Sequence, residues 1–155
     1  MGLKLEEDVI RLINDPETVK AVASADKNGV VHLVYKGSVS VTPEGTIQFL
    51  ELNETSQTNK NLVYSLWFNR LISITVAGKD RRSYQIKGLP VRTIIAGKEF
   101  ERQYVAVRER LGGDADLSAV WIIEPREIRE ETPAVRRAAE RAEYPLIGHL
   151  DRFAR

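Results

Sequence analysis

The chain has 155 residues, of which 43% are hydrophobic and 29% charged, with a formal net charge of +1 and no cysteine. This length suits one globular domain that buries about 70% of the surface its unfolded chain exposes. The absence of cysteine excludes disulfides, thiolate nucleophiles and thiolate metal sites, and the small net charge provides no field that would gather nucleic acid or an anionic membrane.

The amino-terminal sequence and the apolar runs bear on where the protein works. No apolar run approaches the roughly 20 residues of a membrane-spanning helix. The first thirteen residues, MGLKLEEDVIRLI, contain acidic residues in place of the basic patch and unbroken apolar stretch of a secretory signal. We therefore expect a cytoplasmic protein with no membrane partner.

In chain order, the pattern begins with a short amphipathic helix and then becomes mainly β. Leu5, Val9 and Leu12 recur at helical spacing until Asp15-Pro16 ends the pattern. Runs of alternating or branched residues, separated by turn formers such as DKNG at 26–29, then predict strands. The expected strands are residues 19–25, 30–36, 38–41, 46–52, 71–76, 81–97 and 118–123.

Three further helices are expected. The first follows the polar residues 53–56. Its apolar positions, which we expect to form one buried stripe, are Leu62, Val63, Leu66 and Trp67. The second has apolar residues at helical spacing over 100–111 and stops at Gly112-Gly113. The third, residues 134–143, follows Thr132-Pro133 and has few large apolar residues, so we expect it to pack weakly or on a partner.

These elements predict a mainly β fold with flanking helices. Strands outnumber helices about two to one and no strand–helix–strand repeat occurs, which favours a closed or nearly closed antiparallel barrel. Gly88 and Pro90 predict a bend in the long strand, and Glu124-Pro125 should end the last one. We assign residues 1–131 to the barrel and 132–155 to a C-terminal helical extension. The expected anchors of that extension are Tyr144, Leu146, Ile147, Leu150 and Phe153.

The start of the helix that follows residue 55 is the best candidate for binding chemistry. Thr55, Ser56 and Thr58 can accept first-turn N–H groups, and Lys60 lies one turn further on. Free amides, the positive end of a helix dipole and a lysine together form an anion site, most often for phosphate. The same residues also suit an ordinary helix cap with a solvated lysine.

No set of residues with a catalytic pattern is present. The sequence has neither GxxxxGKS nor GxGxxG, and it has no GxSxG elbow. The two histidines, His32 and His149, are far apart, and we expect both to be structural. If the protein is catalytic, a cofactor should therefore supply the reactive group.

An ordered set of segments resembles the FMN-binding split-barrel proteins related to pyridoxamine 5′-phosphate oxidase. The resemblance covers residues 12–133 and rests on KAVASADKNGVVHLVYKG, GTIQF, SQTNKNL, RLISITV, SYQIKG and VWIIEPREIREETP. It implies an FMN-binding split β-barrel of antiparallel Greek-key type. It also implies a homodimer with two FMN sites at the subunit interface.

The resemblance implies which residues would hold FMN. Those that match the phosphate-binding helix start are Ser56, Thr58 and Lys60. Those that match the segment beside the ribityl chain and ring are Tyr35, Lys36, Ser38 and Val39. Ser83 is the closest match to a residue that approaches the flavin from the other subunit. The candidates for the wall of the ring cleft are Tyr35, Trp67 and Phe68, although the position of Trp67 favours core packing.

Several departures from the family pattern limit what carries over. Phe68-Asn69-Arg70 stands where members commonly have asparagine–proline–arginine. The oxidase's arginine-rich phosphate signature is missing, since Lys36 is the only basic residue there. The oxidase's carboxy-terminal substrate residues have no counterpart, which argues against pyridoxamine phosphate oxidation itself.

We therefore expect an FMN-dependent oxidoreductase of this class that acts on an unidentified small molecule. One alternative is a non-catalytic module that holds flavin or another cofactor as a sensor or store. A second is a barrel that binds single-stranded nucleic acid, which requires Lys79, Arg81 and Arg82 to join exposed aromatics on one face. The sequence does not distinguish FMN from a deazaflavin or haem in the same cleft, and it identifies no catalytic residue.

Overall fold

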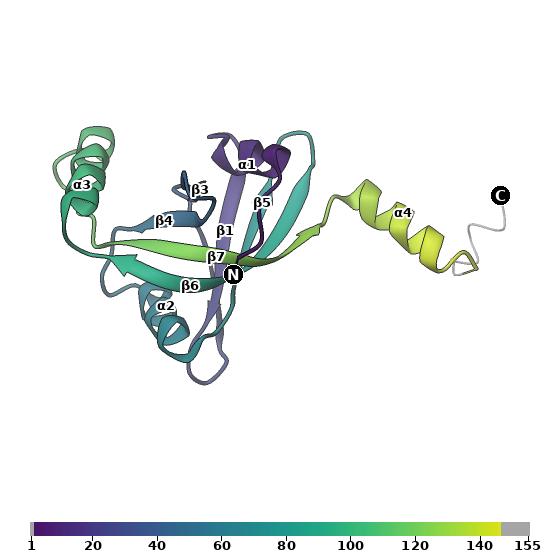
Figure 1. The fold of residues 1–155 in the computed structure, drawn as a ribbon, viewed down its shortest axis with the longest axis horizontal. Coiled ribbons are helices and arrows are strands. Elements are labelled where there is room, and N and C mark those ends of the chain that lie inside the picture. The colour runs from purple at the N-terminus through teal and green to yellow at the C-terminus, as the bar shows by residue number, and fades with distance from the viewer. Residues whose placement is uncertain (1, 147–155) are drawn as a thin grey trace.

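The computed structural model describes residues 2–146, which form one curled antiparallel sheet of seven strands with four helices (Figure 1). The strands are β1 Val19–Ala25, β2 Val31–Tyr35, β3 Ser40–Val41, β4 Ile47–Glu51, β5 Ile72–Ala77, β6 Ser83–Ile94 and β7 Ala119–Glu130. The helices are α1 Glu7–Asn14, α2 Gln57–Phe68, α3 Lys98–Leu111 and α4 Pro133–Glu143. In this part of the chain, no helix is long and apolar enough to cross a membrane.

The sheet has the strand order β2-β1-β5-β6-β7-β4-β3, with every described pair antiparallel. This order leaves β2 and β3 as edge strands, so the barrel is split and strand pairing does not close it. Side chains bridge the opening: Lys36 Nζ lies 2.8 Å from Glu51 Oε2, and the Leu50 amide donates to Ser38 Oγ at 3.0 Å. The expected mainly β split barrel is therefore confirmed, and its opening runs between the segment after β2 and strand β4.

The long strands β6 and β7 bend where the sequence places glycine and proline. The register of the pair shifts between Lys87 and Gly88 and again between Pro90 and Arg92. A Cβ on Gly88 would come within 2.4 Å of Ile123 Cγ2, so this position requires glycine. The prediction that Glu124-Pro125 ends the last strand is wrong, because β7 continues to Glu130. Pro125 pairs with Gly88 at the register shift, where the ladder is already irregular and a missing N–H does not break regular pairing.

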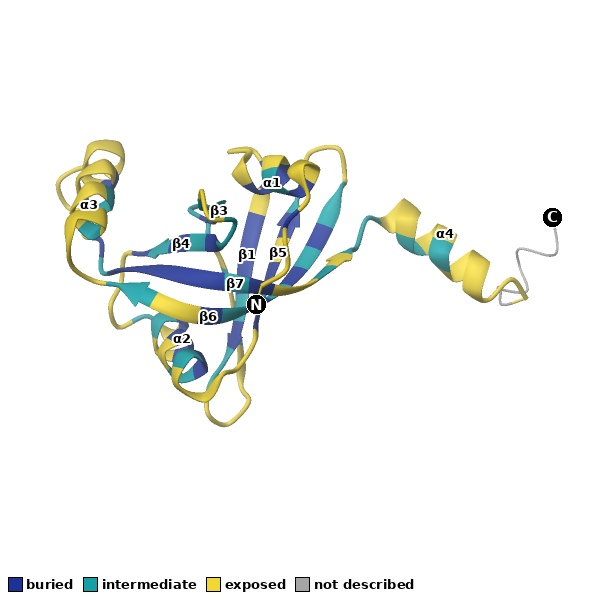
Figure 2. Cartoon of the chain, in the orientation of Figure 1, coloured by how far each residue is buried: buried dark blue, intermediate teal, exposed yellow. Residues whose placement is uncertain are grey.

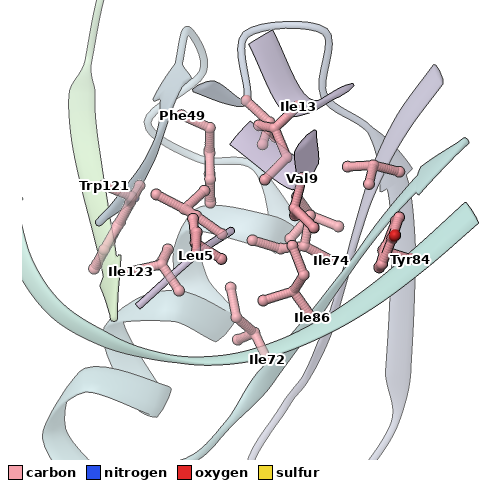
Figure 3. Packing of buried hydrophobic residues seen from close by; sticks show 14 of the residues in the cluster. Leu5, Val9, Ile13, Phe49, Ile72, Ile74, Tyr84, Ile86, Trp121 and Ile123 are labelled. Carbon is pink, nitrogen blue, oxygen red and sulfur yellow. The ribbon is translucent and has the colours of Figure 1, made fainter. Parts of the chain in front are cut away.

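The core lies inside the curl of the sheet (Figures 2 and 3). Its largest fully buried side chains include Phe49, Ile74, Ile86, Trp121 and Ile123, and α1 covers them with Val9, Leu12 and Ile13. On β7, Val120 and Ile122 alternate with Trp121 and Ile123 and therefore face the opposite side of the sheet. There they form a second, smaller cluster with Val107 of α3 and Leu117.

Helix α2 turns a largely polar face with Leu62 to the barrel, and three of its large apolar side chains lie outside. Its buried residues are Thr58, Asn61, Leu62 and Ser65, whereas Trp67 is 77% exposed and Val63 and Phe68 are also exposed. The predicted buried stripe is therefore wrong for Val63 and Trp67. The physical reason is a polar contact with the sheet: Asn61 Nδ2 donates to Ser24 Oγ at 3.1 Å, which fixes the rotation of the helix.

Helix α4 projects beyond the end of the sheet (Figure 1), and none of its residues is buried. Two residues connect it to β7, and both bond to the first residue of β6. The Glu131 amide donates to the Ser83 carbonyl at 2.7 Å, and the Ser83 amide donates to Thr132 Oγ1 at 3.1 Å. The expected anchors Ile147, Leu150 and Phe153, together with His149, lie outside the described residues.

Candidate cofactor site

Within residues 2–146, the start of α2 has backbone donors and a lysine without partners. Ser56 caps the helix, since its Oγ accepts the Asn59 amide at 3.0 Å. The amides of Gln57 and Thr58 have no acceptor within residues 2–146. Lys60 is exposed and forms no ion pair with a described residue, and helical side chains lean towards the N-terminus. The arrangement can therefore offer two amides, the positive end of the dipole and an ammonium group to one anion.

The barrel core holds this helix start in place. Trp121, which is fully buried, donates its indole N–H to Asn59 Oδ1 at 3.0 Å. Asn59 in turn donates from Nδ2 to the Glu54 carbonyl at 2.9 Å. Of the three predicted phosphate-binding residues, Thr58 has a buried side chain, so its amide is the group that could reach a ligand.

Lys36 is already neutralised by Glu51. Their side chains are only 15% and 3% exposed, and the second oxygen of Glu51 accepts the Asn53 amide at 3.1 Å. This buried ion pair joins the end of β2 to the segment that leads from β4 into α2. Lys36 therefore links two segments of the chain through its ion pair with Glu51. Lys60 is the lysine available to bind an anion.

Ser38 and Val39 also make contacts within the chain. Ser38 Oγ bonds to the backbone of Leu50, and Val39 is 1% exposed in the core. The Val39 amide donates to the Lys36 carbonyl at 3.2 Å, and its own carbonyl accepts Lys20 Nζ at 3.0 Å. In the segment that the resemblance places beside the cofactor, Tyr35 is consequently the residue with an open side chain.

The buried Lys20 predicts a pH dependence of stability. Burial lowers the pKa of Lys20 below its ordinary 10.5, and nearby Asp15 acts in the opposite direction. The unfolded chain therefore binds the proton more strongly, so the free energy of unfolding should rise as the pH increases from the lowered value towards 10.5. Urea unfolding at successive alkaline pH values measures this slope. Lys20→Met should flatten the slope relative to the exposed control Lys27→Met, and equal slopes in the two variants would contradict the argument.

An open apolar surface lies on the outer face of edge strand β2, whose end is linked to the segment before α2 by the Lys36–Glu51 ion pair. Val31, Leu33 and Tyr35 are 70%, 66% and 78% exposed on edge strand β2. They pair with Ala25, Ala23 and Ala21 of β1. On this face, large apolar side chains at the sheet edge therefore lie beside a row of small ones. The sequence analysis singled out Tyr35 and missed Val31 and Leu33. The signal was present, because residues 30–35 are apolar on both alternating faces of an edge strand.

Ser83 lies on the same face of the sheet but far from Tyr35. The register runs from Tyr35 through Ala21 and Thr75 to Gln85, and Ser83 stands two residues before Gln85. Three strand spacings separate Tyr35 from β6, about 14 Å. Within one chain, Ser83 is therefore not brought to the helix start, and it could share a ligand with Tyr35 only across two copies.

Two hollows adjoin this face. One, of about 290 Å³, includes Ala23, Val31 and Lys87 in its lining. The other, of about 510 Å³, lies between the β1–β2 turn and the end of α2 and shares Ala25 and Leu71 with the first. Volumes of this order suit small ligands, although each hollow is open to one side.

Two of the three basic residues after β5 form ion pairs with α1 and the segment that follows it. Lys79 pairs with Glu17, and Arg82 pairs with Asp8 at 2.9 Å. Arg82 also lies over the ring of Tyr84, which is buried. This arrangement does not provide the exposed aromatic surface that the nucleic-acid alternative requires.

Solved structures share this fold. No family model matches the sequence, and no curated protein matches it. HupZ of Group A Streptococcus is 21% identical, with a TM-score of 0.68 over 83% of this chain and 95% of its own. An FMN-binding protein from Syntrophomonas wolfei is 15% identical, with a TM-score of 0.67 over 81% and 84%. HutZ of Vibrio cholerae, described as a heme storage protein, is 13% identical, with a TM-score of 0.59 over 83% and 95%.

These likenesses confirm the fold that the sequence resemblance implied. The chain has the split-barrel fold found in an FMN-binding protein, and it shares that fold with a protein described as storing heme. At these identities the likeness shows the fold alone, so the ligand must be argued from this chain's own residues.

Proposed function

We propose that this protein binds FMN between two copies of the chain and transfers electrons or hydride to a small molecule. One observation carries the proposal: a helix start whose Gln57 and Thr58 amides and Lys60 are unpaired within residues 2–146 is linked to the end of β2, a strand with an open apolar outer face. The Lys36–Glu51 ion pair holds the two features together. This combination suits a ligand that has an anionic tail and a flat apolar body.

The residues fit FMN in chemistry and charge. A phosphate monoester has about two negative charges near neutral pH and is best held by a lysine with amide and hydroxyl donors. Lys60 and the amides of Gln57 and Thr58 would hold it, and Tyr35 would border the ring. Bound FMN would supply the redox chemistry. The chain itself binds, orients and excludes water, which is consistent with a sequence that has no acid–base constellation.

A second copy forms part of the proposal because of the distance between Tyr35 and Ser83. The two side chains share one sheet face but lie about 14 Å or more apart. Ser83 of a partner subunit could approach a ring that rests on Tyr35, whereas Ser83 of the same chain could not. The proposed assembly is therefore a homodimer with a site at its interface.

A non-catalytic cofactor store is the second candidate. The similarity to HutZ, described as a heme storage protein, favours it. His32 would not ligate haem on the apolar face, because it pairs with Ser24 on the side of β2 that faces the barrel interior. A haem on this face would need an axial ligand from elsewhere.

The absorption spectrum of the purified full-length protein tests these readings. Flavin bands that bleach under anaerobic addition of NADH or NADPH support the oxidoreductase. Flavin bands that both nucleotides leave unchanged favour the store, and a Soret band favours haem. A colourless preparation that neither takes up added FMN nor gains thermal stability with it would overturn the proposal.

A further inference from the structure

We infer that α4 is a docking arm for a second copy of this chain, and that it seats on Trp67 and Phe68 of the partner subunit. The inference goes beyond the proposed function, because it assigns a role to a helix outside the candidate site. It depends on two copies meeting and not on any cofactor.

Helix α4 needs a partner to be stable. It has 11 residues, none of them buried, and helices shorter than about 12–15 residues are marginal in water without tertiary packing. Its apolar residues recur at helical spacing and form a narrow stripe. The members of this α4 stripe are Val135, Ala138, Ala139 and Ala142.

The base of α4 is fixed, so the helix cannot fold back onto its own barrel. Glu131 and Thr132 are the only residues between β7 and α4, and each forms a hydrogen bond with the backbone of Ser83. Pro133 then fixes the first turn. Turning α4 towards its own chain would break both bonds. The sheet therefore sets the direction in which α4 points, which is away from the body (Figure 1).

The outer side of α2 offers an exposed aromatic surface. Trp67 and Phe68 are exposed large aromatics, and the ring of Phe68 lies 4.7 Å from that of Tyr64. Exposed apolar patches of this kind mark interaction sites. Small alanines on one helix allow large aromatic side chains of another to interdigitate. Arg136 and Arg141 flank the α4 stripe and can lie over an indole ring.

The chain exposes enough surface, beyond that of a compact monomer, for a second copy to cover in a standard interface. A compact monomer of 17.5 kDa exposes about 7,900 Å², whereas this chain exposes 10447 Å². The residues outside 2–146 can contribute at most about 1,700 Å², the exposure of an unfolded segment of their mass. About 800 Å² of excess remains, which is the area that one partner buries in a standard interface.

Cysteine cross-linking tests the arm directly, because the chain contains no cysteine. The double variant Ala139→Cys/Phe68→Cys, treated with a short bismaleimide, should run as a covalent dimer on a denaturing gel. The matched control Ala139→Cys/Leu111→Cys places the second thiol on an exposed residue of α3 and should stay monomeric. A Phe68 variant that does not cross-link, or a control that cross-links equally, would overturn the inference.

The oligomeric state gives a second readout. Ala139→Asp puts a charge on the α4 stripe and should weaken self-association by about tenfold or more, measured by light scattering over a dilution series. Arg137→Asp adds the same side chain to the opposite face of the helix and should leave association near that of the unmodified chain. Equal association of the two variants would contradict the arm. Dimers that cross-link but bind no flavin would overturn the proposed function and leave the arm standing.

Discussion

Lys36→Met should lower the free energy of unfolding by about 3–5 kcal/mol, because it leaves Glu51 buried without a counter-ion. The Glu51 side chain is 3% exposed, so water cannot replace the lost lysine. Urea unfolding followed by circular dichroism measures the effect. We also expect weaker FMN binding, since the ion pair joins the end of β2 to the segment that leads into α2.

Two variants separate this effect from a general loss of surface charge. The double variant Lys36→Met/Glu51→Gln should recover much of the stability, because a neutral amide remains where the unpaired carboxylate would be. Arg11→Met breaks the exposed Arg11–Glu7 pair, 3.1 Å, and should cost no more than about 1 kcal/mol. If Lys36→Met lowers the free energy of unfolding as little as Arg11→Met does, the Lys36–Glu51 ion pair does not stabilise the barrel.

Lys60→Ala should weaken FMN binding by about tenfold or more, since hydrogen bonds to charged groups contribute roughly 1.5–3 kcal/mol. Titration with FMN, followed by quenching of flavin fluorescence, measures the dissociation constant. Added salt should weaken binding to the unmodified protein more than binding to the variant. The free energy of unfolding should stay nearly unchanged, because Lys60 is exposed and forms no ion pair within residues 2–146.

Lys98→Ala is the matched control for this prediction. Lys98 is also an exposed lysine near a helix start, that of α3, but it lies outside the candidate site. FMN affinity should be the same with and without it. If both variants bind FMN as tightly as the unmodified chain, the phosphate is held elsewhere.

Much of the fold could be predicted from local sequence. The cap at Ser56 fixes the start of α2 because its short side chain accepts a first-turn amide. Alternation of apolar residues located the strands, and Gly88 with Pro90 located the bend. The error at Trp67 has a physical cause. The side of α2 that meets the sheet combines Leu62 with polar residues and is held by the Asn61–Ser24 hydrogen bond, so hydrophobicity alone placed Leu62 correctly and Trp67 wrongly.

The candidate site was less predictable, because it depends on contacts between distant segments. Nothing near Lys36 in the sequence shows that Glu51 neutralises it. The distance between Tyr35 and Ser83 follows from strand order, which local patterns do not determine. The apolar character of Val31 and Leu33 was visible in the sequence, but their pairing with the alanines of β1 was not.

The indole of Trp121 contributes both to the hydrophobic core and to the position of the start of α2. Its ring packs in the barrel core, and its N–H donates to the side chain of Asn59 in the first turn of α2, which in turn binds the Glu54 carbonyl before the helix. Loosening of the interior would therefore displace the turn that we propose as the anion site. If the proposed cofactor binds there, a substitution that loosens the packing around Trp121 should weaken cofactor binding as well as lower stability.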